Sequence, residues 1–409
     1  MLPSDTLRQV ARAQVGEIIS RDLGIEREVL PRIPLGAPVA LVLTGVRRCG
    51  KSTLLAQLAR HRIDRFSFFN FEDSRVIGLS VPEVNRLTEV LDELNGPSAS
   101  LLFDEVQHVE GWEVPVRTLV DRGRRVILTG SNASLLGRTL GTKLTGRHLD
   151  IEVFPFSFRE YLLFRREKPG RAAFERYLRA GGFPSYLKFP SSELLRELFT
   201  DIVDRDVLAR HRVREEAALR GAAVFLLTNI AKEVSYRSIA RLFDLRSATT
   251  ASTFVSLLED AYLVQTVPLY DASMKRRLLN PKKVYAIDTA LARANSTSFS
   301  EDLGGALENA AFLHLRRQFR EIFYFRSKDG RGECDLVVRE RGGRPSVYQV
   351  CWSLSQDNLA REVGGLRVAL EHLGLREGTI LTLDQEDLLE EGGKRFRVWP
   401  LWKWVLGLE

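Results

Sequence analysis

The sequence has few cysteines and no long apolar run. Its 409 residues include only Cys49, Cys334 and Cys351, which are far apart in the chain and lack CxxC spacing. An odd number of isolated cysteines indicates neither a disulfide framework nor a zinc site. No apolar run approaches the roughly 20 residues of a bilayer-spanning helix, and residues 1–20 contain no apolar signal-peptide core. We therefore expect a cytoplasmic protein without a membrane partner.

A large excess of charge of either sign is also missing. Lysine and arginine together number 60 against 53 aspartates and glutamates, a formal net charge of +7. Over this length, so small an excess permits a nucleic-acid partner without requiring one. The hydrophobic share of 44% and the charged share of 28% are typical of soluble globular domains and exclude a disordered or fibrous chain. At about 150 residues per domain, the length predicts two or three domains.

Strand and helix patterns alternate over residues 1–155. Short apolar runs lie at 38–44, 66–71, 99–103 and 125–129, with helical stretches between them. A short continuous apolar run is what a strand buried on both faces of a parallel sheet requires. The alternation therefore predicts an α/β core built on a mostly parallel sheet.

The pattern changes three times in the rest of the chain. Residues 156–216 contain several amphipathic helical stretches and predict a helical subdomain. Residues 217–290 contain three helical stretches and then two strands that flank a basic loop, which is the order of a winged helix. Residues 305–409 return to strands and helices and predict a final α/β domain.

The most specific motif follows the first predicted strand and has the pattern G-x-x-x-x-G-K-S. It consists of Gly45-Val46-Arg47-Arg48-Cys49-Gly50-Lys51-Ser52. Glycines let backbone N–H groups wrap phosphates, and the helix that follows adds the positive end of its dipole. In this pattern Lys51 reaches the β- and γ-phosphates and Ser52 ligates Mg²⁺. The sequence therefore predicts that residues 45–52 bind ATP together with Mg²⁺.

Two carboxylates end a neighbouring predicted strand. Asp104 and Glu105 follow the apolar run at 101–103. Asp104 is expected to hold Mg²⁺, usually through water, and Glu105 to polarise the attacking water as the general base. Acidic pairs after apolar runs are common, so this assignment depends on the phosphate loop. Binding without hydrolysis would not need Glu105, so the pair favours an ATPase.

Two further catalytic candidates follow the strand at 125–129. Ser131 and Asn132 are candidates to sense the γ-phosphate and hold the lytic water, with a capped turn as the alternative. Arg147, after Gly146, is a candidate to act on the nucleotide of a neighbouring subunit, with an ordinary surface arginine as the alternative. An arginine finger that acts in trans requires a homo-oligomer, for which a hexamer is one possible ring size.

The order of these motifs is similar to that of a known family. The chain resembles a prokaryotic family of AAA+ ATPases in the phosphate loop, the Asp-Glu strand end, Gly146-Arg147, residues 154–160 and Gly181-Gly182-Phe183-Pro184. The resemblance covers nearly the whole chain, and members carry a C-terminal domain of unknown function. It implies a P-loop NTPase core of AAA+ type that binds and hydrolyses ATP. It also implies a winged helix followed by a PD-(D/E)xK-like α/β domain related to restriction endonucleases.

The predicted winged helix carries its positive charge on the hairpin. Its third helix, at 248–260, offers mainly Thr and Ser where a sequence-reading helix usually presents Arg, Lys, Asn or Gln. Sequence-specific readout is therefore not expected. The hairpin has five cations within nine residues: Lys275, Arg276, Arg277, Lys282 and Lys283. We expect them to contact DNA phosphates, in a way that depends on DNA structure rather than sequence; a solvated hairpin tip or a protein contact is the alternative.

The last domain departs from the PD-(D/E)xK frame at two positions. Glu308 and Asp335 fit its acidic residues, but Gln349 and Cys351 stand where Glu and Lys are expected. An amide is a poor substitute for a carboxylate on Mg²⁺, and a thiol provides no fixed cation. Lys328 is a candidate to supply that charge from the preceding strand. We expect a nuclease-like fold without nuclease activity.

Three functional hypotheses follow. The first is a Mg²⁺-dependent ATPase of AAA+ type, coupled to DNA binding or remodelling through its C-terminal half. The second is a nucleotide-switched signalling or protein-interaction scaffold with slow turnover. The third, an active nuclease, is disfavoured by Gln349 and Cys351.

Overall fold

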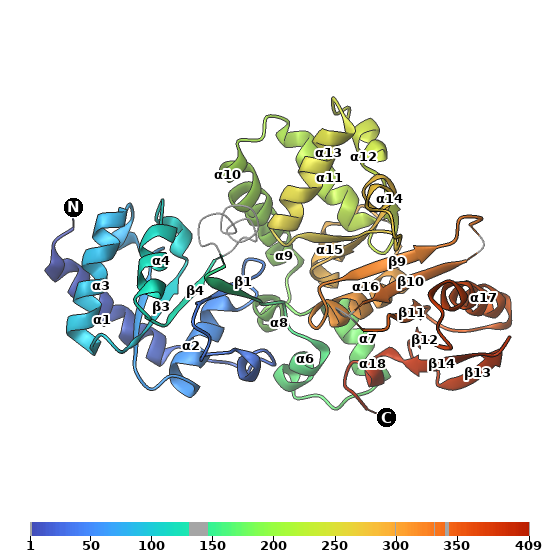
Figure 1. Cartoon of the computed structure of the whole chain (residues 1–409), viewed down its shortest axis with the longest axis horizontal. Coiled ribbons are helices and arrows are strands. Elements are labelled where there is room, and N and C mark those ends of the chain that lie inside the picture. Colours follow the sequence, from blue (N-terminus) through green and yellow to red (C-terminus); the bar gives the residue numbers. More distant parts are fainter. Residues whose placement is uncertain (1, 131–145, 299, 331, 340–342, 409) are drawn as a thin grey trace. The chain divides into compact units, whose positions relative to one another are not determined.

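The computed structural model describes residues 2–130, 146–298, 300–330, 332–339 and 343–408 (Figure 1). These residues form two compact units, Met1–Phe154 with Asp260–Tyr262, and Pro155–Glu259 with Leu263–Glu409. Within the described ranges, no helix has both the length and the hydropathy needed to cross a bilayer.

The first unit is built on a five-stranded parallel sheet with the order β2-β3-β4-β1-β5. The strands are β1 (Ala40–Thr44), β2 (Phe66–Asn70), β3 (Ser100–Asp104), β4 (Val126–Thr129) and β5 (His148–Glu152). Every residue of β1, β3 and β4 is buried, as continuous apolar runs predict for central strands. The α/β core on a parallel sheet is therefore confirmed. Strand β5 is not among the predicted strands, because polar residues occupy three of its five positions.

The described part of this unit also contains four α-helices: α1 (Ser4–Ser20), α2 (Lys51–His61), α3 (Val81–Asn95) and α4 (Glu113–Asp121). Leu7 of α1, Leu87 of α3 and Phe103 of β3 belong to the same buried core. The helix α1 therefore belongs to the ATPase-like core, and α2 begins directly after the loop that leaves β1.

The second unit begins with helices. They are α6 (Phe158–Arg165), α7 (Arg171–Ala180), α8 (Pro184–Lys188), α9 (Ser192–Asp201) and α10 (Ala209–His211), with a π-helical turn at Ile202–Leu208. Glycine is required between α7 and α8, because a Cβ on Gly182 would lie 2.2 Å from the carbonyl oxygen of Phe156. The Phe156 N–H donates to the Gly182 carbonyl at 2.7 Å, so the segments at 154–160 and 181–184 are packed together.

A three-stranded antiparallel sheet with the order β6-β8-β7 follows. The elements are α11 (Glu216–Thr228), β6 (Glu233–Val234), α12 (Tyr236–Leu242), α13 (Ala248–Asp260), β7 (Val264–Val267), α14 (Met274–Leu279), β8 (Lys282–Ala286) and α15 (Thr289–Asn295). The expected basic loop between the strands is partly helical. The Ser273 hydroxyl accepts from the Arg276 N–H at 3.4 Å and caps α14.

The chain ends in a six-stranded mixed sheet with the order β13-β14-β12-β11-β10-β9. Its elements are α16 (Leu303–Arg316), β9 (Ile322–Arg326), β10 (Glu333–Val338), β11 (Ser346–Val350), α17 (Gln356–Leu373), β12 (Glu377–Thr382), β13 (Asp387–Glu391), β14 (Lys394–Pro400) and α18 (Leu401–Trp404). Leu269 bridges Tyr324 of β9 in parallel, and the Tyr270 N–H donates to the Tyr324 carbonyl at 2.7 Å. The two sheets are thus joined by backbone hydrogen bonds.

Candidate functional site

The predicted phosphate loop connects the end of β1 to the first turn of α2. Two of its residues must be glycine. Gly45 has a φ of 145° and a Cβ there would lie 2.1 Å from the Val153 carbonyl oxygen, while Gly50 has a φ of 101°. Val46 and Cys49 are buried, Arg47 is half-buried and Arg48 is exposed. The loop therefore presents backbone groups at the N-terminus of a helix, which is an arrangement that binds anions.

Lys51 lies inside the curve of this loop. Its side chain is buried, and its ammonium donates to the carbonyl oxygens of Gly45 at 3.0 Å and Val46 at 3.1 Å. The Lys51 ammonium thus lies among the backbone groups of the phosphate loop. The same ammonium is therefore in position to exchange these carbonyls for phosphate oxygens.

A buried supporting residue holds the loop from outside. The guanidinium of Arg27 donates to the Cys49 carbonyl at 2.9 Å and to the Phe154 carbonyl at 2.7 Å. Gln57 of α2 in turn accepts from the Arg27 N–H at 3.2 Å. Sequence reasoning missed Arg27, because nothing local distinguishes it from the other arginines. Its contacts come from residues 22 and 127 positions away in the chain.

The two predicted magnesium ligands lie side by side. The Ser52 hydroxyl donates to Asp104 Oδ1 at 3.0 Å, and Asp104 at the end of β3 is almost completely buried. Burial, followed by repulsion from Glu105, raises the pKa of Asp104. One hydroxyl and one carboxylate fit Mg²⁺, which commonly takes one or two protein ligands and completes its shell with phosphates and water. The described residues contain no group of three acidic, His or Cys side chains that could hold a metal alone.

A third residue, Thr129, completes this arrangement. Its hydroxyl donates to Asp104 Oδ1 at 2.5 Å and accepts from the Glu105 N–H at 2.9 Å. The signal available in the sequence was its place as the last residue of β4, the strand next to β3. The predicted residues Ser131 and Asn132 lie outside the described part of the chain.

Glu105 adopts an uncommon backbone conformation. Its φ of 52° is in the left-handed region, which a non-glycine residue rarely adopts. The hydrogen bond to Thr129 holds this conformation, and Gln107 donates to the carboxylate. Strain of this kind is concentrated at functional sites. The carboxylate directly follows Asp104, as a general base near the metal requires.

Arg147 does not lie at the phosphate loop of its own chain. Its carbonyl accepts from the N–H of Ala40, where β1 begins, whereas the loop follows the other end of β1. At about 3.3 Å per residue, the strand separates the two points by roughly 15 Å. The Arg147 side chain is partly exposed, and its Nε donates to Asp121 Oδ1 at 2.6 Å.

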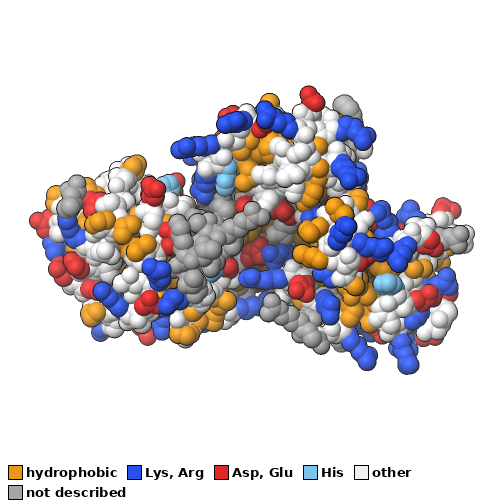
Figure 2. Space-filling view, turned by 45° about the horizontal axis from the view of Figure 1, so that its top comes forward, with side chains coloured by type: hydrophobic (Ala, Val, Ile, Leu, Met, Phe, Trp, Pro, Cys, Tyr) orange, Lys and Arg blue, Asp and Glu red, His pale blue; other side chains and the backbone are white. Residues whose placement is uncertain are grey.

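Four of the five predicted DNA-binding residues have side chains that reach the surface, and the fifth is buried. Lys275 and Arg276 are exposed, and Arg277 and Lys282 are half-buried. On the face shown in Figure 2, Lys and Arg side chains are interspersed with Asp and Glu. The prediction that Lys283 contacts DNA is wrong, because its side chain is buried and its ammonium lies 2.6 Å from Asp335.

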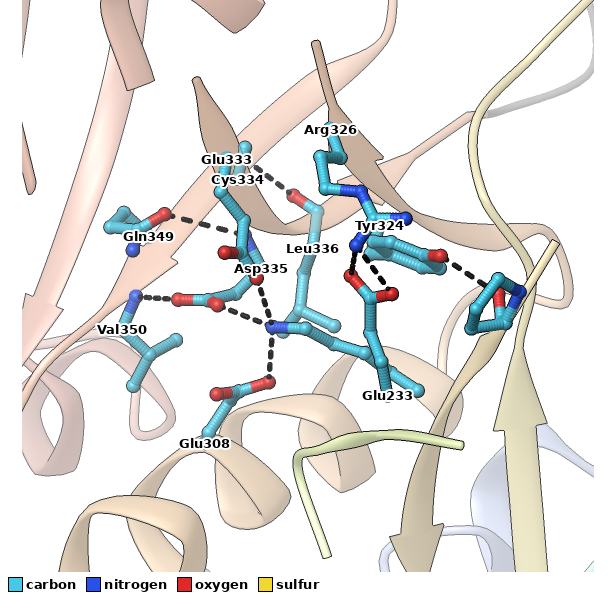
Figure 3. A network of polar contacts seen from close by, with 12 residues as sticks. Glu233, Glu308, Tyr324, Arg326, Glu333, Cys334, Asp335, Leu336, Gln349 and Val350 are labelled. Carbon is cyan, nitrogen blue, oxygen red and sulfur yellow. Dashed lines mark hydrogen bonds and ion pairs between the residues drawn. The ribbon is translucent and has the colours of Figure 1, made fainter. Parts of the chain in front are cut away.

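The residues of the nuclease-like frame are only partly brought together. Asp335 and Gln349 lie on neighbouring strands, and the Asp335 N–H donates to Gln349 Oε1 at 3.3 Å. Glu308 of α16 joins them through Lys283 (Figure 3). Lys328, the candidate to supply the missing positive charge, is exposed in the turn after β9. Burial raises the pKa of Cys351 to about 12, so its thiol stays neutral.

Comparison with known proteins identifies the first unit. Residues 38–162 match the model of an AAA domain, and residues 171–302 match a domain of unknown function (DUF8612). The chain is 30% identical to the uncharacterized protein MJ1544 of Methanocaldococcus jannaschii, over 96% of this chain and 92% of that protein. It is also 30% identical to an uncharacterized protein of Haemophilus influenzae, over 68% of this chain and 74% of that protein.

Among solved structures, the chain is similar to the Walker-type ATPase PABY2304 of Pyrococcus abyssi. The identity is 18% and the TM-score 0.45, over 66% of this chain and 95% of that one. The matched AAA domain, together with the parallel sheet, supports a P-loop ATPase core. The chain therefore belongs to the family of the uncharacterized protein MJ1544, and its residues 38–162 form an AAA-type domain.

Proposed function

We propose that this protein is a Mg²⁺-dependent ATPase whose nucleotide state controls a DNA-binding C-terminal half. The observation that carries the catalytic part is the arrangement at Asp104. Ser52 and Thr129 both donate to its Oδ1, and Glu105 follows it directly at the edge of the sheet. The loop that follows β1 would thus bind the nucleotide, and the end of β3 would supply a metal ligand and the base, with β4 between these two strands.

The residues divide the chemistry between them. The loop N–H groups and Lys51 bind the β- and γ-phosphates, and Ser52 and Asp104 would hold Mg²⁺. When bound, Mg²⁺ supplies positive charge that offsets the charge on the phosphate oxygens. Glu105 accepts the proton of the attacking water. Thr129 holds the Asp104 carboxylate and the backbone of Glu105 in place.

The catalytic assignment is tested by ATP turnover of three variants. Lys51→Ala is expected to lose nucleotide binding. Glu105→Gln is expected to keep binding and lose about 100-fold or more in kcat, because only the proton acceptor is removed. Glu110→Gln removes an exposed carboxylate on the same segment and serves as the control. Turnover that persists unchanged in Lys51→Ala or Glu105→Gln would contradict the assignment.

The DNA-binding part of the proposal depends on the three-stranded sheet. The order α11, β6, α12, α13, β7 and β8 supports a winged helix, with α13 as its third helix. The basic cluster, which we now define as Lys275, Arg276, Arg277 and Lys282, lies on α14 and the start of β8. The order α16, β9, β10, β11, α17 and β12 supports a PD-(D/E)xK-like domain without cleavage activity.

Gel shifts with duplex, branched and single-stranded DNA at several salt concentrations test this part. Removing Lys275 and Arg276 together is expected to reduce the slope of log K against log salt by about two for duplex DNA. The control, Arg165→Ala with Lys168→Ala, removes the same charge from the surface near α6. If no DNA binds in a salt-sensitive manner with or without ATP, the DNA-binding part is wrong.

An absence of salt-sensitive DNA binding would favour a nucleotide-switched protein scaffold. The observation in its favour is the apolar surface of α14. Met274, Leu278 and Leu279 are exposed by 65%, 56% and 69%. Exposed apolar side chains on one short helix suit a protein contact better than a phosphate backbone. In that case mutation of these three residues, and not of the cations, abolishes partner binding.

A further inference from the structure

A lysine ammonium lies at the centre of a group of acidic side chains in the second unit. Lys283 Nζ is 2.6 Å from Asp335 Oδ1, 3.2 Å from Glu308 Oε1 and 3.4 Å from Glu333 Oε1. In Figure 3 the carboxylates of Glu308 and Asp335 point toward this one nitrogen atom. The lysine comes from β8, Glu308 comes from α16 and the other two acids come from β10. Residues from three elements therefore meet at one cation.

Three of these four residues are buried, whereas the side chain of Glu333 is exposed. Lys283 is 3% exposed, Asp335 5% and Glu308 9%. Burial alone would lower the pKa of Lys283, but Asp335 and Glu308 outweigh it and raise this pKa well above its usual range. Burial, and then repulsion from Asp335, raises the pKa of Glu308, whereas the ammonium of Lys283 opposes this rise. Lys283 therefore supplies the positive charge beside two buried carboxyl groups.

The other polar atoms around the ammonium are also engaged. Asp335 Oδ2 accepts from the Val350 N–H at 2.8 Å, and the Tyr285 hydroxyl donates to Glu308 Oε1 at 2.6 Å. Gln349 accepts from the Asp335 N–H and donates to Glu362 Oε2 at 2.7 Å. Both the oxygen and the nitrogen of the Gln349 amide are thus engaged in hydrogen bonds. In the described part of the chain, Asp335 and Glu308 form no ion pair with a second cation.

Strand β8, which carries this lysine, is also bound to α16 by other contacts. The Ala286 N–H donates to Asn309 Oδ1 at 2.7 Å, and Asn309 Nδ2 donates to the Ala286 carbonyl at 3.0 Å. The rings of Tyr285 and Phe312 stack with their centroids 4.1 Å apart. Strand β8 is therefore bound along its length to α16, and the ammonium is the ionic part of this contact.

We propose that Lys283 is a built-in cation that takes the place of a divalent metal ion at this centre. The tethered ammonium keeps metal out, joins the three-stranded sheet to the six-stranded sheet, and leaves the C-terminal half independent of metal. Carboxylates from separate elements converge on one point, as they do around a cation. The ammonium supplies that charge without being lost to solvent. This inference does not depend on the ATPase assignment.

The test is to remove the ammonium and ask whether a cation from solution replaces it. In Lys283→Ala, Asp335 and Glu308 lose their counterion and a space opens between them. The nucleotide-free variant is expected to bind one more Mn²⁺ per chain than wild type, measured by the EPR signal of free Mn²⁺.

Two controls make the result specific. Lys282→Ala removes the neighbouring lysine, which lies over the Tyr236 ring and is not buried, and should bind no more Mn²⁺ than wild type. Adding Asp335→Asn to Lys283→Ala should abolish the additional binding. Melting temperatures measured with and without Mn²⁺ should show that only Lys283→Ala is destabilised and then restored by the metal.

Three outcomes would overturn the proposal. One is a folded Lys283→Ala chain that binds no additional Mn²⁺. Another is a Lys283→Ala chain that stays unfolded with and without Mn²⁺, because a cation from solution then fails to replace the ammonium. The third is a wild-type chain that binds Mn²⁺ in a manner that Asp335→Asn abolishes, because the centre would then accept a metal with Lys283 present.

Discussion

At the scale of single residues, the proposed chemistry depends on two hydroxyl groups that share one oxygen of Asp104. Ser52 would exchange this hydrogen bond for Mg²⁺, whereas Thr129 also accepts from the Glu105 N–H and must stay in place. Thr129→Val keeps the shape and removes both bonds. We expect kcat for ATP to fall about 10- to 100-fold, as for other residues that orient metal ligands, with little change in KM.

Two variants serve as references for Thr129→Val. Thr129→Ser restores the hydroxyl and should recover most of the turnover. Thr118→Val removes a surface hydroxyl that donates to the Val114 carbonyl of its own helix, so it should leave kcat unchanged. Steady-state kinetics that show equal losses in Thr129→Val and Thr118→Val would contradict the role of Thr129.

Arg27 gives a second prediction at this scale. Arg27→Ala leaves the buried carbonyls of Cys49 and Phe154 without this donor, at a cost of about 1–3 kcal/mol in the free energy of unfolding for each. It should also raise the KM for ATP, because Cys49 belongs to the phosphate loop. Arg62→Ala is the matched control, since Arg62 donates to the carbonyl of Leu30, outside the phosphate loop. Urea unfolding and ATP titration would separate the two effects.

At the scale of elements, the turn before α8 is held by one buried carboxylate. Asp288 caps α15 by accepting from the Leu291 N–H at 2.9 Å, and accepts from the Gly182 N–H at 2.6 Å. A Cβ on Gly181 would lie 2.3 Å from the Asp288 carboxylate, so this glycine is required for the contact. Burial raises the pKa of Asp288 from 3.8 to about 6, although the N–H groups oppose the rise.

This pKa predicts a pH dependence of stability. Between about pH 4 and 6 the folded state keeps a proton on Asp288 that the unfolded state has lost. The protonated Asp288 therefore contributes its full stabilisation of the folded state below about pH 4, and this stabilisation is lost as the pH rises through 6. Relative to Asp288→Asn, wild type should lose at most about 3 kcal/mol of unfolding free energy over this range. Urea unfolding at several pH values checks it; a constant difference between the two proteins would contradict it.

Elements with a continuous local pattern could be predicted from the sequence. The buried strands β1, β3 and β4, the phosphate loop and the carboxylates that follow β3 each depend on neighbouring residues alone. Strand β5 and Thr129 could not be found this way. The first pairs with β1 more than a hundred residues away, and the function of the second depends on the register between β3 and β4.

The two adjacent lysines of β8 illustrate the same limit. Successive side chains of a strand point to opposite faces, so Lys282 and Lys283 lie on opposite faces of their sheet. Which one is buried depends on the pairing of Lys283 with Glu233 and on the packing of β8 against α16. Neither is visible in a local pattern. The prediction that Lys282 and Lys283 belong to one surface cluster is therefore wrong.

At the scale of the whole molecule, the net charge of +7 gives little guidance to a partner. Several cations already have partners within the chain. Lys283 pairs with buried acids, Arg27 donates to backbone carbonyls, and Arg326 lies 2.8 Å from Glu233. Positive and negative side chains alternate over the face in Figure 2. We therefore expect any DNA binding to depend on the four residues of the basic cluster rather than on a general positive field.

Assembly is the other question at this scale, and it concerns Arg147. The loop of the same chain follows the far end of β1, so a catalytic Arg147 must act on a neighbouring subunit. Its ion pair with Asp121 is partly exposed and costs little to break. We therefore expect Arg147→Ala to lower turnover, and wild-type turnover per chain to rise with protein concentration.

Mixing inactive subunits separates action in trans from a structural role. Arg147→Ala subunits keep an intact nucleotide site, and Glu105→Gln subunits keep an intact Arg147. If the arginine acts in trans, mixing the two restores turnover, because some Arg147→Ala sites then face an intact arginine. If Arg147 acts only within its own chain, the mixture stays as slow as the average of its parts. Sedimentation with and without ATP must show mixed oligomers, since a fully active monomer would rule out the finger at once.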